Sequence, residues 1–349
     1  MKWLLGFVPV AILIHYVAPD RPLLVFAASG LAIIPLAGWM GHATEHLAAR
    51  LGEGIGGFLN ATFGNAAEMI IAIAALRAGL HEVVKASLAG AIIGNVLLVL
   101  GASMLAGGIG RPEQKYNAAG ARSQATMLTL AVIALIVPAA LRATEGVAEG
   151  SLGTLSVLVS LTLLLTYALN LLFSLGTHRT LFAGEGHAEE GHAAHWSVKR
   201  SALVLAGATA AIAWMSEILV HAIQPATKSL GLSDVFVGVF VVAILGNAAE
   251  HFSAITAARK DRMDLSLSIA IGSSVQVALF VAPLLVLLSY AVGPRPMDLA
   301  FPGGPILSIL LSTLITGQVS GDGRSDWLRG VQLLAVYVML GLAFFFAPG

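Results

Sequence analysis

The pentapeptide Gly-Asn-Ala-Ala-Glu occurs twice in this chain, and each copy lies inside a long apolar run. The first copy, residues 64–68, is part of GGFLNATFGNAAEMIIAIAAL (56–76). The second copy, residues 246–250, is part of FVVAILGNAAEHFSAITAA (240–258). A carboxylate is costly in such surroundings and is a functional candidate by default. Two identical placements 182 residues apart therefore need a functional explanation.

The composition is that of a membrane protein. Of 349 residues, 57% are hydrophobic and 11% are charged, whereas soluble domains contain about 25% charged residues. The net charge is zero, so nothing suggests a nucleic-acid partner. The absence of cysteine excludes disulfides, thiolate metal sites and cysteine nucleophiles.

Apolar segments recur from end to end and predict an all-α polytopic membrane protein of about 11 helices. They lie at residues 3–18, 22–49, 55–78, 83–107, 121–141, 151–175, 198–223, 231–258, 264–291, 299–317 and 326–347. The first could be a signal peptide. It has one Lys before it and no clear small-residue cleavage site, so we interpret it as a retained helix.

The distribution of Lys and Arg predicts the orientation, because these residues accumulate in cytoplasmic loops. The side of the membrane that holds the N-terminus carries 13 of the 19 Lys and Arg residues, and the opposite side carries 6. The N-terminus is therefore predicted to be cytoplasmic, and eleven crossings place the C-terminus outside. We expect the inner (cell) membrane of a bacterium or archaeon.

The two pentapeptides belong to a longer internal repeat. Residues 64–77 and 246–259 are identical at 9 of 14 positions, including Arg77 and Arg259. The copies fall in the third and eighth spans and so cross the membrane in opposite directions. Such inverted repeats are typical of secondary transporters, which bind substrate near the midplane. The predicted parts are an extra N-terminal helix (1–20), two five-helix halves (21–176 and 201–349) and a linker (177–200).

The repeated residues are suited to binding a hard cation. Asn and Glu three residues apart share a helix face, so Asn65 accompanies Glu68, and Asn247 accompanies Glu250. The glycine before each Asn tolerates a helix break, which would free carbonyl oxygens. Two facing copies would form an all-oxygen cage that suits Ca²⁺. Alternatively, each Glu is merely protonated and hydrogen-bonded across a helix pair, although the duplication favours an ion site.

Glu45 and Glu217 lie in the first helix of each half, in WMGHATEHLAA and WMSEILVHA, and each follows a Trp-Met pair. We expect them along access paths to the ion site. Both could instead be helix-end residues at the membrane interface.

Other polar residues fall close to the repeated motifs or inside apolar segments. His251 follows the second repeated Glu; it could tune that carboxylate, carry protons or pack against a neighbouring helix. Asn95 and Gln276 occupy nearly corresponding places in the fourth and ninth helices, where Ser273 and Ser274 add hydroxyl groups. These four residues could wall the site or act as ordinary polar contacts between helices.

The linker contains a cluster that could sense a metal, although a solvated linker is favoured: His187, Glu189, Glu190, His192 and His195. The chain has no HExxH, GxSxG or Gly-Lys-Ser/Thr motif. An enzyme is therefore not expected. The alternative from that class is a membrane metalloenzyme using His221, His251 and Glu250.

Several long stretches resemble the Ca²⁺/H⁺ antiporters of the calcium/cation antiporter superfamily. They are GGFLNATFGNAAE (56–68), VFVGVFVVAILGNAAEH (235–251) and IAIGSSVQVALFVAP (269–283). QKYNAAGARSQATMLTLAVIALIVPA (114–139) also resembles the fifth-helix region of that family. The resemblance extends over nearly the whole chain from about Gly38.

The resemblance implies one extra helix plus two inverted five-helix halves. It implies Glu68 and Glu250 as shared Ca²⁺ and proton sites, with Asn65 and Asn247 nearby and Glu45 and Glu217 along the access paths. It also implies an acidic cytoplasmic segment, here GEGHAEEGH (184–192). One departure is that Ala91 and Gly94 occupy GAIIGN (90–95), where relatives often have Ser.

The expected function is secondary transport that exports cytoplasmic Ca²⁺ in exchange for H⁺ by alternating access. Ca²⁺ and protons would compete for the Glu pair, with Ca²⁺ as a transported substrate and no cofactor. Na⁺/Ca²⁺ or another divalent exchange on the same scaffold remains an alternative. The sequence is compatible with a homo-oligomer.

Overall fold

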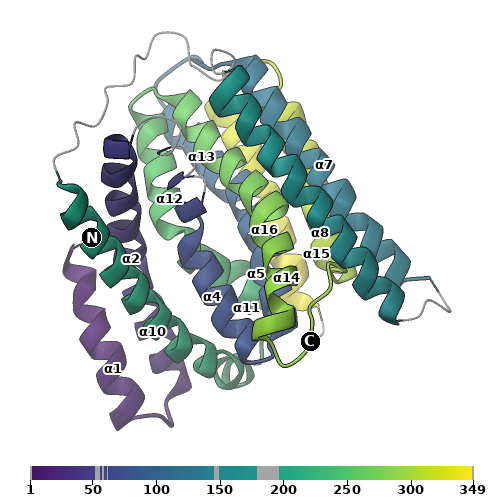
Figure 1. Ribbon diagram of the computed structural model, residues 1–349. Helices are drawn as coiled ribbons and strands as arrows, with labels where there is room; N and C mark the ends of the chain where they lie inside the picture. The colour runs from purple at the N-terminus through teal and green to yellow at the C-terminus, as the bar shows by residue number, and fades with distance from the viewer. Residues whose placement is uncertain are drawn as a thin grey trace. The chain divides into compact units, whose positions relative to one another are not determined.

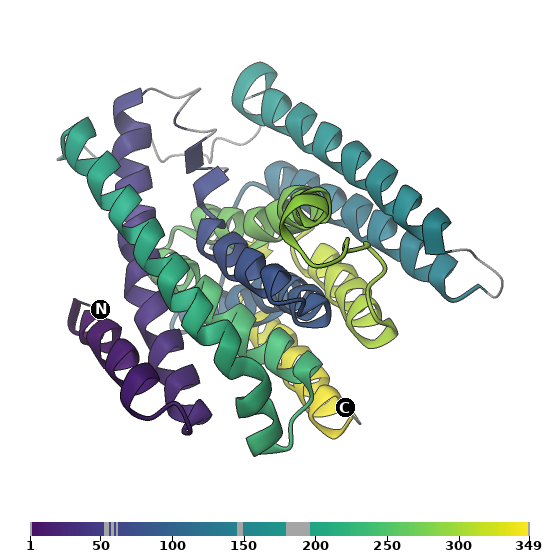
Figure 2. The same ribbon diagram turned by 60° about the horizontal axis from the view of Figure 1, so that its bottom comes forward.

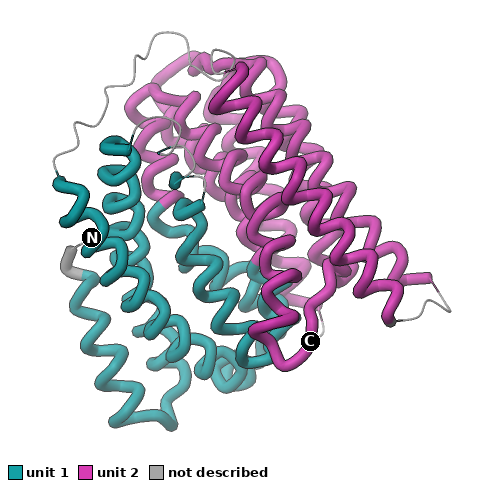
Figure 3. The backbone as a smooth tube through the Cα atoms, viewed as in Figure 1, with its two compact units in different colours: residues 1–87, 188–249, 348–349 teal, residues 88–187, 250–347 magenta. Residues whose placement is uncertain are grey.

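The computed structural model describes residues 2–51, 56, 59–60, 62–144, 149–178 and 196–347. These residues are predominantly helical, and their strands β1 (Gln114–Lys115) and β2 (Arg324–Ser325) pair antiparallel. The chain divides into two compact units (Figure 3). Unit 1 comprises residues 1–87, 188–249 and 348–349, and unit 2 comprises residues 88–187 and 250–347. Each unit thus draws on both predicted halves of the sequence.

Unit 1 contains the first helices of each half. The extra N-terminal segment forms the 3₁₀ helix η1 (Lys2–Gly6) and α1 (Phe7–Val17), and the first half contributes α2 (Pro22–Leu51), α4 (Ala66–Arg77) and the start of α5 (His81–Ile93). From the second half come α10 (Val198–Leu230), α11 (Asp234–Val237), the π-helical η4 (Gly238–Val242) and the start of α12 (Ala243–Arg259). The long helices α2 and α10 lie side by side (Figures 1 and 2).

Unit 2 contains the remaining helices of both halves. Its first-half elements are the end of α5, the π-helical η2 (Gly94–Val99), α6 (Leu100–Gly108), α7 (Ala118–Arg142), α8 (Glu149–Leu171) and η3 (Leu172–Thr177). Its second-half elements are the end of α12, α13 (Met263–Gln276), η5 (Val277–Val281), α14 (Ala282–Val292), α15 (Gly303–Val319) and α16 (Trp327–Phe346). Helix α16 packs against α6, and α7 packs against both α13 and α15.

Glycine permits the close approach of α6 and α16. A Cβ atom at Gly330 would come within 2.6 Å of the carbonyl oxygen of Gly101. Small residues allow membrane helices to pack backbone against backbone in this way.

The predicted spans agree closely with the helices. Among the described residues, eight helical segments are long and apolar enough to cross a membrane, and two shorter apolar helices cover Leu4–Val17 and Gly303–Val319. The tenth span begins at Gly303 and not at residue 299, because the preceding segment is rich in proline and is not helical. The third span is interrupted: α4 begins only at Ala66, after a turn at Gly64 and Asn65.

The repeat extends to local helix geometry. The π-helical segment η5 covers residues 277–281, and a shift of 182 places these on residues 95–99 of η2. The same backbone irregularity therefore occurs at equivalent positions of the two halves. Isolated π-helical turns within α-helices are often found at functional sites.

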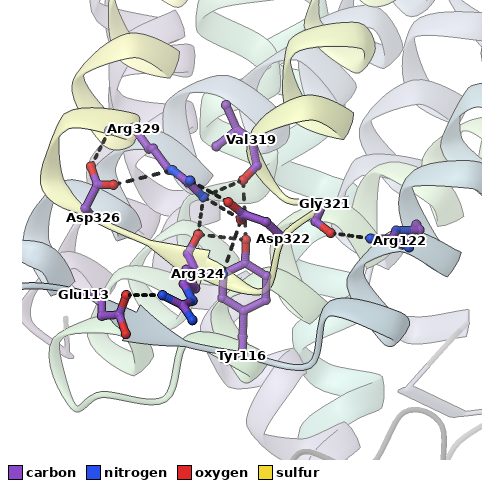
Figure 4. A network of polar contacts seen from close by, with 9 residues as sticks. All are labelled: Glu113, Tyr116, Arg122, Val319, Gly321, Asp322, Arg324, Asp326 and Arg329. Atoms are coloured by element: carbon purple, nitrogen blue, oxygen red, sulfur yellow. Dashed lines mark hydrogen bonds and ion pairs between the residues drawn. The ribbon is translucent and has the colours of Figure 1, made fainter.

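A polar network joins the α6–α7 connection to the α15–α16 connection within unit 2 (Figure 4). The Arg329 guanidinium makes a bidentate contact with Asp322, with both N–O distances at 2.6 Å. The Tyr116 hydroxyl donates to the carbonyl oxygen of Arg324 at 3.2 Å, and the Arg324 side chain pairs with Glu113 at 3.3 Å. The hydrogen bond from Arg329 lowers the pKa of Asp322 to about 2.

Candidate ion-binding site

The first copy of the motif lies where a helix restarts. Asn65 is buried and precedes α4, with φ −97° and ψ 20°, and Glu68 lies in the first helical turn. The backbone amides at a helix N-terminus favour a negative charge there. The predicted break at this copy is therefore present, and Asn65 lies outside the helix that carries Glu68.

The predicted break at the second copy is wrong, because α12 continues without interruption from Ala243 to Arg259. The irregular turn is η4, which ends before the motif begins. Gly246 has a different role: a Cβ atom there would lie 3.0 Å from Cγ of Glu68. The missing side chain therefore leaves room for the carboxylate of the first copy.

The two copies are joined by a hydrogen bond within unit 1. The side-chain amide of Asn247 donates to Oε1 of Glu68 and also to the carbonyl oxygen of Ala243, at 2.9 Å for the latter. Oδ1 of Asn247 is buried and has no hydrogen-bond partner among the described residues. A buried acceptor normally requires a partner, which makes this oxygen a candidate ligand for a cation.

The second glutamate belongs to a hydrogen-bonded chain within unit 2. Ser273 forms a side-chain hydrogen bond with Glu250. Nδ2 of Asn95 donates to Oγ of Ser273 at 3.2 Å, and Nε2 of His251 lies 3.2 Å from Oδ1 of Asn95. In this orientation of the Asn95 amide, His251 is the donor. Oε2 of Glu250 is buried without a hydrogen-bond partner in the described part of the chain.

Two of the residues expected to wall the site make other contacts. Oγ of Ser274 donates to the carbonyl oxygens of Ala270 at 3.0 Å and Ile92 at 3.4 Å. It thus links α13 to α5, as the helix-contact interpretation predicts. Gln276 forms a side-chain hydrogen bond with Tyr167 of α8. Of the four residues expected to line the site, Asn95 and Ser273 are the two that hydrogen bonds connect to Glu250.

The two access-path candidates have basic partners within unit 1. Glu45 is exposed on α2, and its Oε2 lies 3.4 Å from Nδ1 of His42. Glu217 of α10 forms an ion pair with Arg77 at the end of α4, with Nη1 and Oε1 2.9 Å apart. The sequence did not predict this partner for Glu217, although the presence of Arg at both Arg77 and Arg259 of the repeat marked the position as a candidate.

The metalloenzyme alternative finds little geometric support. Nδ1 of His221 lies 2.7 Å from the carbonyl oxygen of Glu217 in its own helix. Across the described ranges, no three His, Asp or Glu side chains cluster as a metal site would require. The linker cluster at residues 187–195 lies outside the described residues.

Comparison with known proteins identifies the family. The sodium/calcium exchanger protein family matches residues 21–176 and 200–346. The chain is 45% identical over 359 residues to the Ca(2+)/H(+) antiporter of Aphanothece halophytica, covering 99% of this chain and 96% of that protein. It is 42% identical over 324 residues to the Ca(2+)/H(+) antiporter ChaA of Bacillus subtilis, covering 92% of each.

A solved structure agrees with the fold. Native YfkE superposes with a TM-score of 0.84 and 37% identity, covering 98% of both chains. The predicted architecture, an extra N-terminal helix followed by two inverted five-helix repeats, is confirmed. The chain is therefore a membrane protein that belongs to the sodium/calcium exchanger family.

Proposed function

We propose that this protein exchanges Ca²⁺ for H⁺ and exports Ca²⁺ from the cytoplasm. The observation that carries the proposal is the repeated Asn-x-x-Glu motif, whose two copies meet in the hydrogen bond from Asn247 to Glu68. The names of relatives that match along nearly the whole chain support the same substrates. These relatives are transporters and lend no support to a metalloenzyme.

Glu68 and Glu250 are the carboxylates that bind Ca²⁺ and protons in turn, with the Asn65 and Asn247 amides nearby. Carboxylate and amide oxygens are the ligands that Ca²⁺ prefers. The loaded forms, with Ca²⁺ or with protons, cross between inward- and outward-facing states. The empty form with two negative charges does not, because unpaired charges are costly in the membrane. This exclusion makes the exchange obligatory.

The surrounding residues have supporting roles in this proposal. His251, Asn95 and Ser273 orient the Glu250 carboxylate, and Glu45 and Glu217 lie along the access paths. The extra helix (1–20), the two halves (21–176 and 201–349) and the linker (177–200) keep the division proposed above, supported by the two segments that the family matches. The N-terminus is cytoplasmic, supported by the Lys and Arg distribution.

The test is uptake of ⁴⁵Ca²⁺ into liposomes that contain the purified protein. A pH gradient without Na⁺ should drive Ca²⁺ movement, and a Na⁺ gradient at equal pH should not. If only the Na⁺ gradient drives uptake, the protein is a Na⁺/Ca²⁺ exchanger and the proton proposal fails.

Competition at one site gives a second test. Lowering the pH should raise the apparent Ca²⁺ dissociation constant and leave maximal binding at saturating Ca²⁺ nearly unchanged. The two carboxylates titrate as a pair, so the shift belongs to both. Ca²⁺ binding that is independent of pH would show that protons use a separate route.

A further inference from the structure

Unit 2 contains a cavity whose lining serves no role in the proposed exchange. Its volume is about 510 Å³, and its lining residues are Ala106, Ile109, Arg111, Ile255 and Arg259. Three of these side chains are apolar and two are guanidinium groups. The lining comes from the end of α6, the residues just beyond it and the last turns of α12. It therefore combines an apolar surface with two positive charges.

The guanidinium group of Arg111 is held in a fixed position. Nη1 donates to the carbonyl oxygen of Gly107 at 2.7 Å, and Nη2 donates to that of Arg259 at 3.2 Å. Nε lies 3.9 Å from Oδ1 of Asp261. A guanidinium has five N–H donors, so these two hydrogen bonds position the group and leave donors on both terminal nitrogens.

The side chain of Arg259 is available to a ligand. It is exposed, and its guanidinium group forms no ion pair or hydrogen bond with any of the described residues. Its counterpart in the repeat, Arg77, pairs with Glu217 at 2.9 Å. The nearby carboxylate of Asp261 already accepts a hydrogen bond from Gln114 at 2.8 Å. This neutral donor does not cancel the charge of Asp261, but two guanidinium groups lie beside that one carboxylate, so the net charge at the cavity is positive.

We propose that Arg111 and Arg259 bind the phosphate group of an anionic phospholipid, with an acyl chain against Ile109 and Ile255. The planar fork of a guanidinium matches the geometry of phosphate oxygens. The side chain of Ile109 is 66% exposed beside these groups, at the end of a membrane-spanning segment. An apolar surface adjoining a phosphate site suits a lipid better than free phosphate.

The predicted orientation agrees with this ligand. Arg111 and Arg259 both belong to the face that is rich in Lys and Arg and predicted to be cytoplasmic. Basic pockets between membrane helices on that side are suited to anionic lipid headgroups.

The experiment measures how tightly added lipid binds to the full-length, delipidated protein in detergent. Native mass spectrometry follows the binding of phosphatidylglycerol, with phosphatidylcholine as the neutral comparison. Arg259→Gln should weaken phosphatidylglycerol binding about fivefold, as expected for one cation at a membrane surface. Arg259→Lys keeps the charge without the fork and should weaken it less. The matched control is Lys260→Gln, which removes one exposed cation from the next residue and should retain wild-type binding.

Three results would overturn the proposal. The first is equal binding of the two lipids by the wild-type protein. The second is the same loss for Lys260→Gln and Arg259→Gln, which would indicate diffuse surface charge. The third is displacement of phosphatidylglycerol by millimolar inorganic phosphate, which would assign the cavity to free phosphate. Lipid retention is measured without transport, so the outcome is independent of the proposed Ca²⁺/H⁺ exchange.

Discussion

The side-chain amide of Asn247 donates a hydrogen bond to the carboxylate of Glu68, which joins the second copy of the repeated motif to the first. The same amide also donates to the carbonyl oxygen of Ala243, one turn earlier in α12. Both donors of the Asn247 amide group are thus used within the protein. The amide oxygen of Asn247 is buried and has no hydrogen-bond partner among the described residues, and Gly246 leaves the space that Glu68 needs.

Replacing Asn247 by Ala should weaken Ca²⁺ binding without preventing folding. The substitution removes a hydrogen bond to a charged group, worth about 1.5–3 kcal/mol, together with one oxygen ligand. We expect the apparent Ca²⁺ dissociation constant to rise about tenfold or more. Calcium titration of purified protein measures this, with Ser274→Ala as a control because that hydroxyl only links helices. Unchanged affinity would remove Asn247 from the ion site.

The repeated glutamates should both be essential for transport. In the proposed exchange, Glu68→Gln or Glu250→Gln removes one of the two charges that bind the divalent ion in low-dielectric surroundings, where charge pairing is strongest. We expect loss of most ⁴⁵Ca²⁺ flux, with a normal amount of protein in the membrane. Glu45→Gln is the matched control and should alter only the rate or apparent affinity. Wild-type flux from either repeated-site variant would refute the central role of these residues.

The ion pair between Arg77 and Glu217 should influence access more than stability. The Arg77 side chain is 62% exposed and that of Glu217 is 38% exposed, and such pairs contribute about 0.2–1 kcal/mol. Arg77→Gln should release the Glu217 carboxylate from its ion pair. The apparent KM for Ca²⁺ on the side of the membrane that Glu217 faces should then fall about twofold, because local negative charge attracts the cation. Glu217→Gln should raise it.

The double variant separates this effect from a structural one. If Arg77 acts only through Glu217, the Arg77→Gln/Glu217→Gln protein should behave like Glu217→Gln alone. Single variants that change the apparent KM in the same direction would instead indicate a shared structural role.

The network around Arg329 should make stability sensitive to acid. The hydrogen bond from Arg329 lowers the pKa of Asp322 from 3.8 to about 2. A carboxyl group with a lowered folded-state pKa stabilises the fold above its unfolded-state pKa and loses this contribution as the pH falls through the folded-state value. The contribution should therefore be complete above pH 4 and lost towards pH 2.

Thermal unfolding of the wild type and Asp322→Asn measures this contribution. The Asp322 side chain is 53% exposed, so the difference at pH 7 should be about 1 kcal/mol or less. The difference in Tm should shrink by roughly half at pH 3. A difference that is constant from pH 7 to pH 3 would show that the charge of Asp322 is not responsible.

The sequence was sufficient to predict the membrane spans, the duplicated motif and the inverted architecture. Hydrophobic length and the Lys and Arg distribution act locally along the chain, so they can be recognised without tertiary contacts. Asn247 shows the limit of this reasoning. Its spacing suggested Glu250 as its companion, whereas in the structure its amide donates to Glu68. Spacing along one helix does not show which neighbouring helix supplies the hydrogen-bond partner.

Tertiary structure also decided how the equivalent glycines are used. Gly64 lies in a turn that interrupts the third span, whereas Gly246 lies in a continuous helix and makes room for Glu68. Glycine tolerates both environments because it has no Cβ. The repeated pentapeptide therefore could not show which glycine lies in a turn and which lies in a continuous helix. The partners of Ser273, Ser274 and Arg77 likewise depend on helices that are distant in the sequence. Sequence determined where polar groups enter the membrane, and packing determined which of them meet.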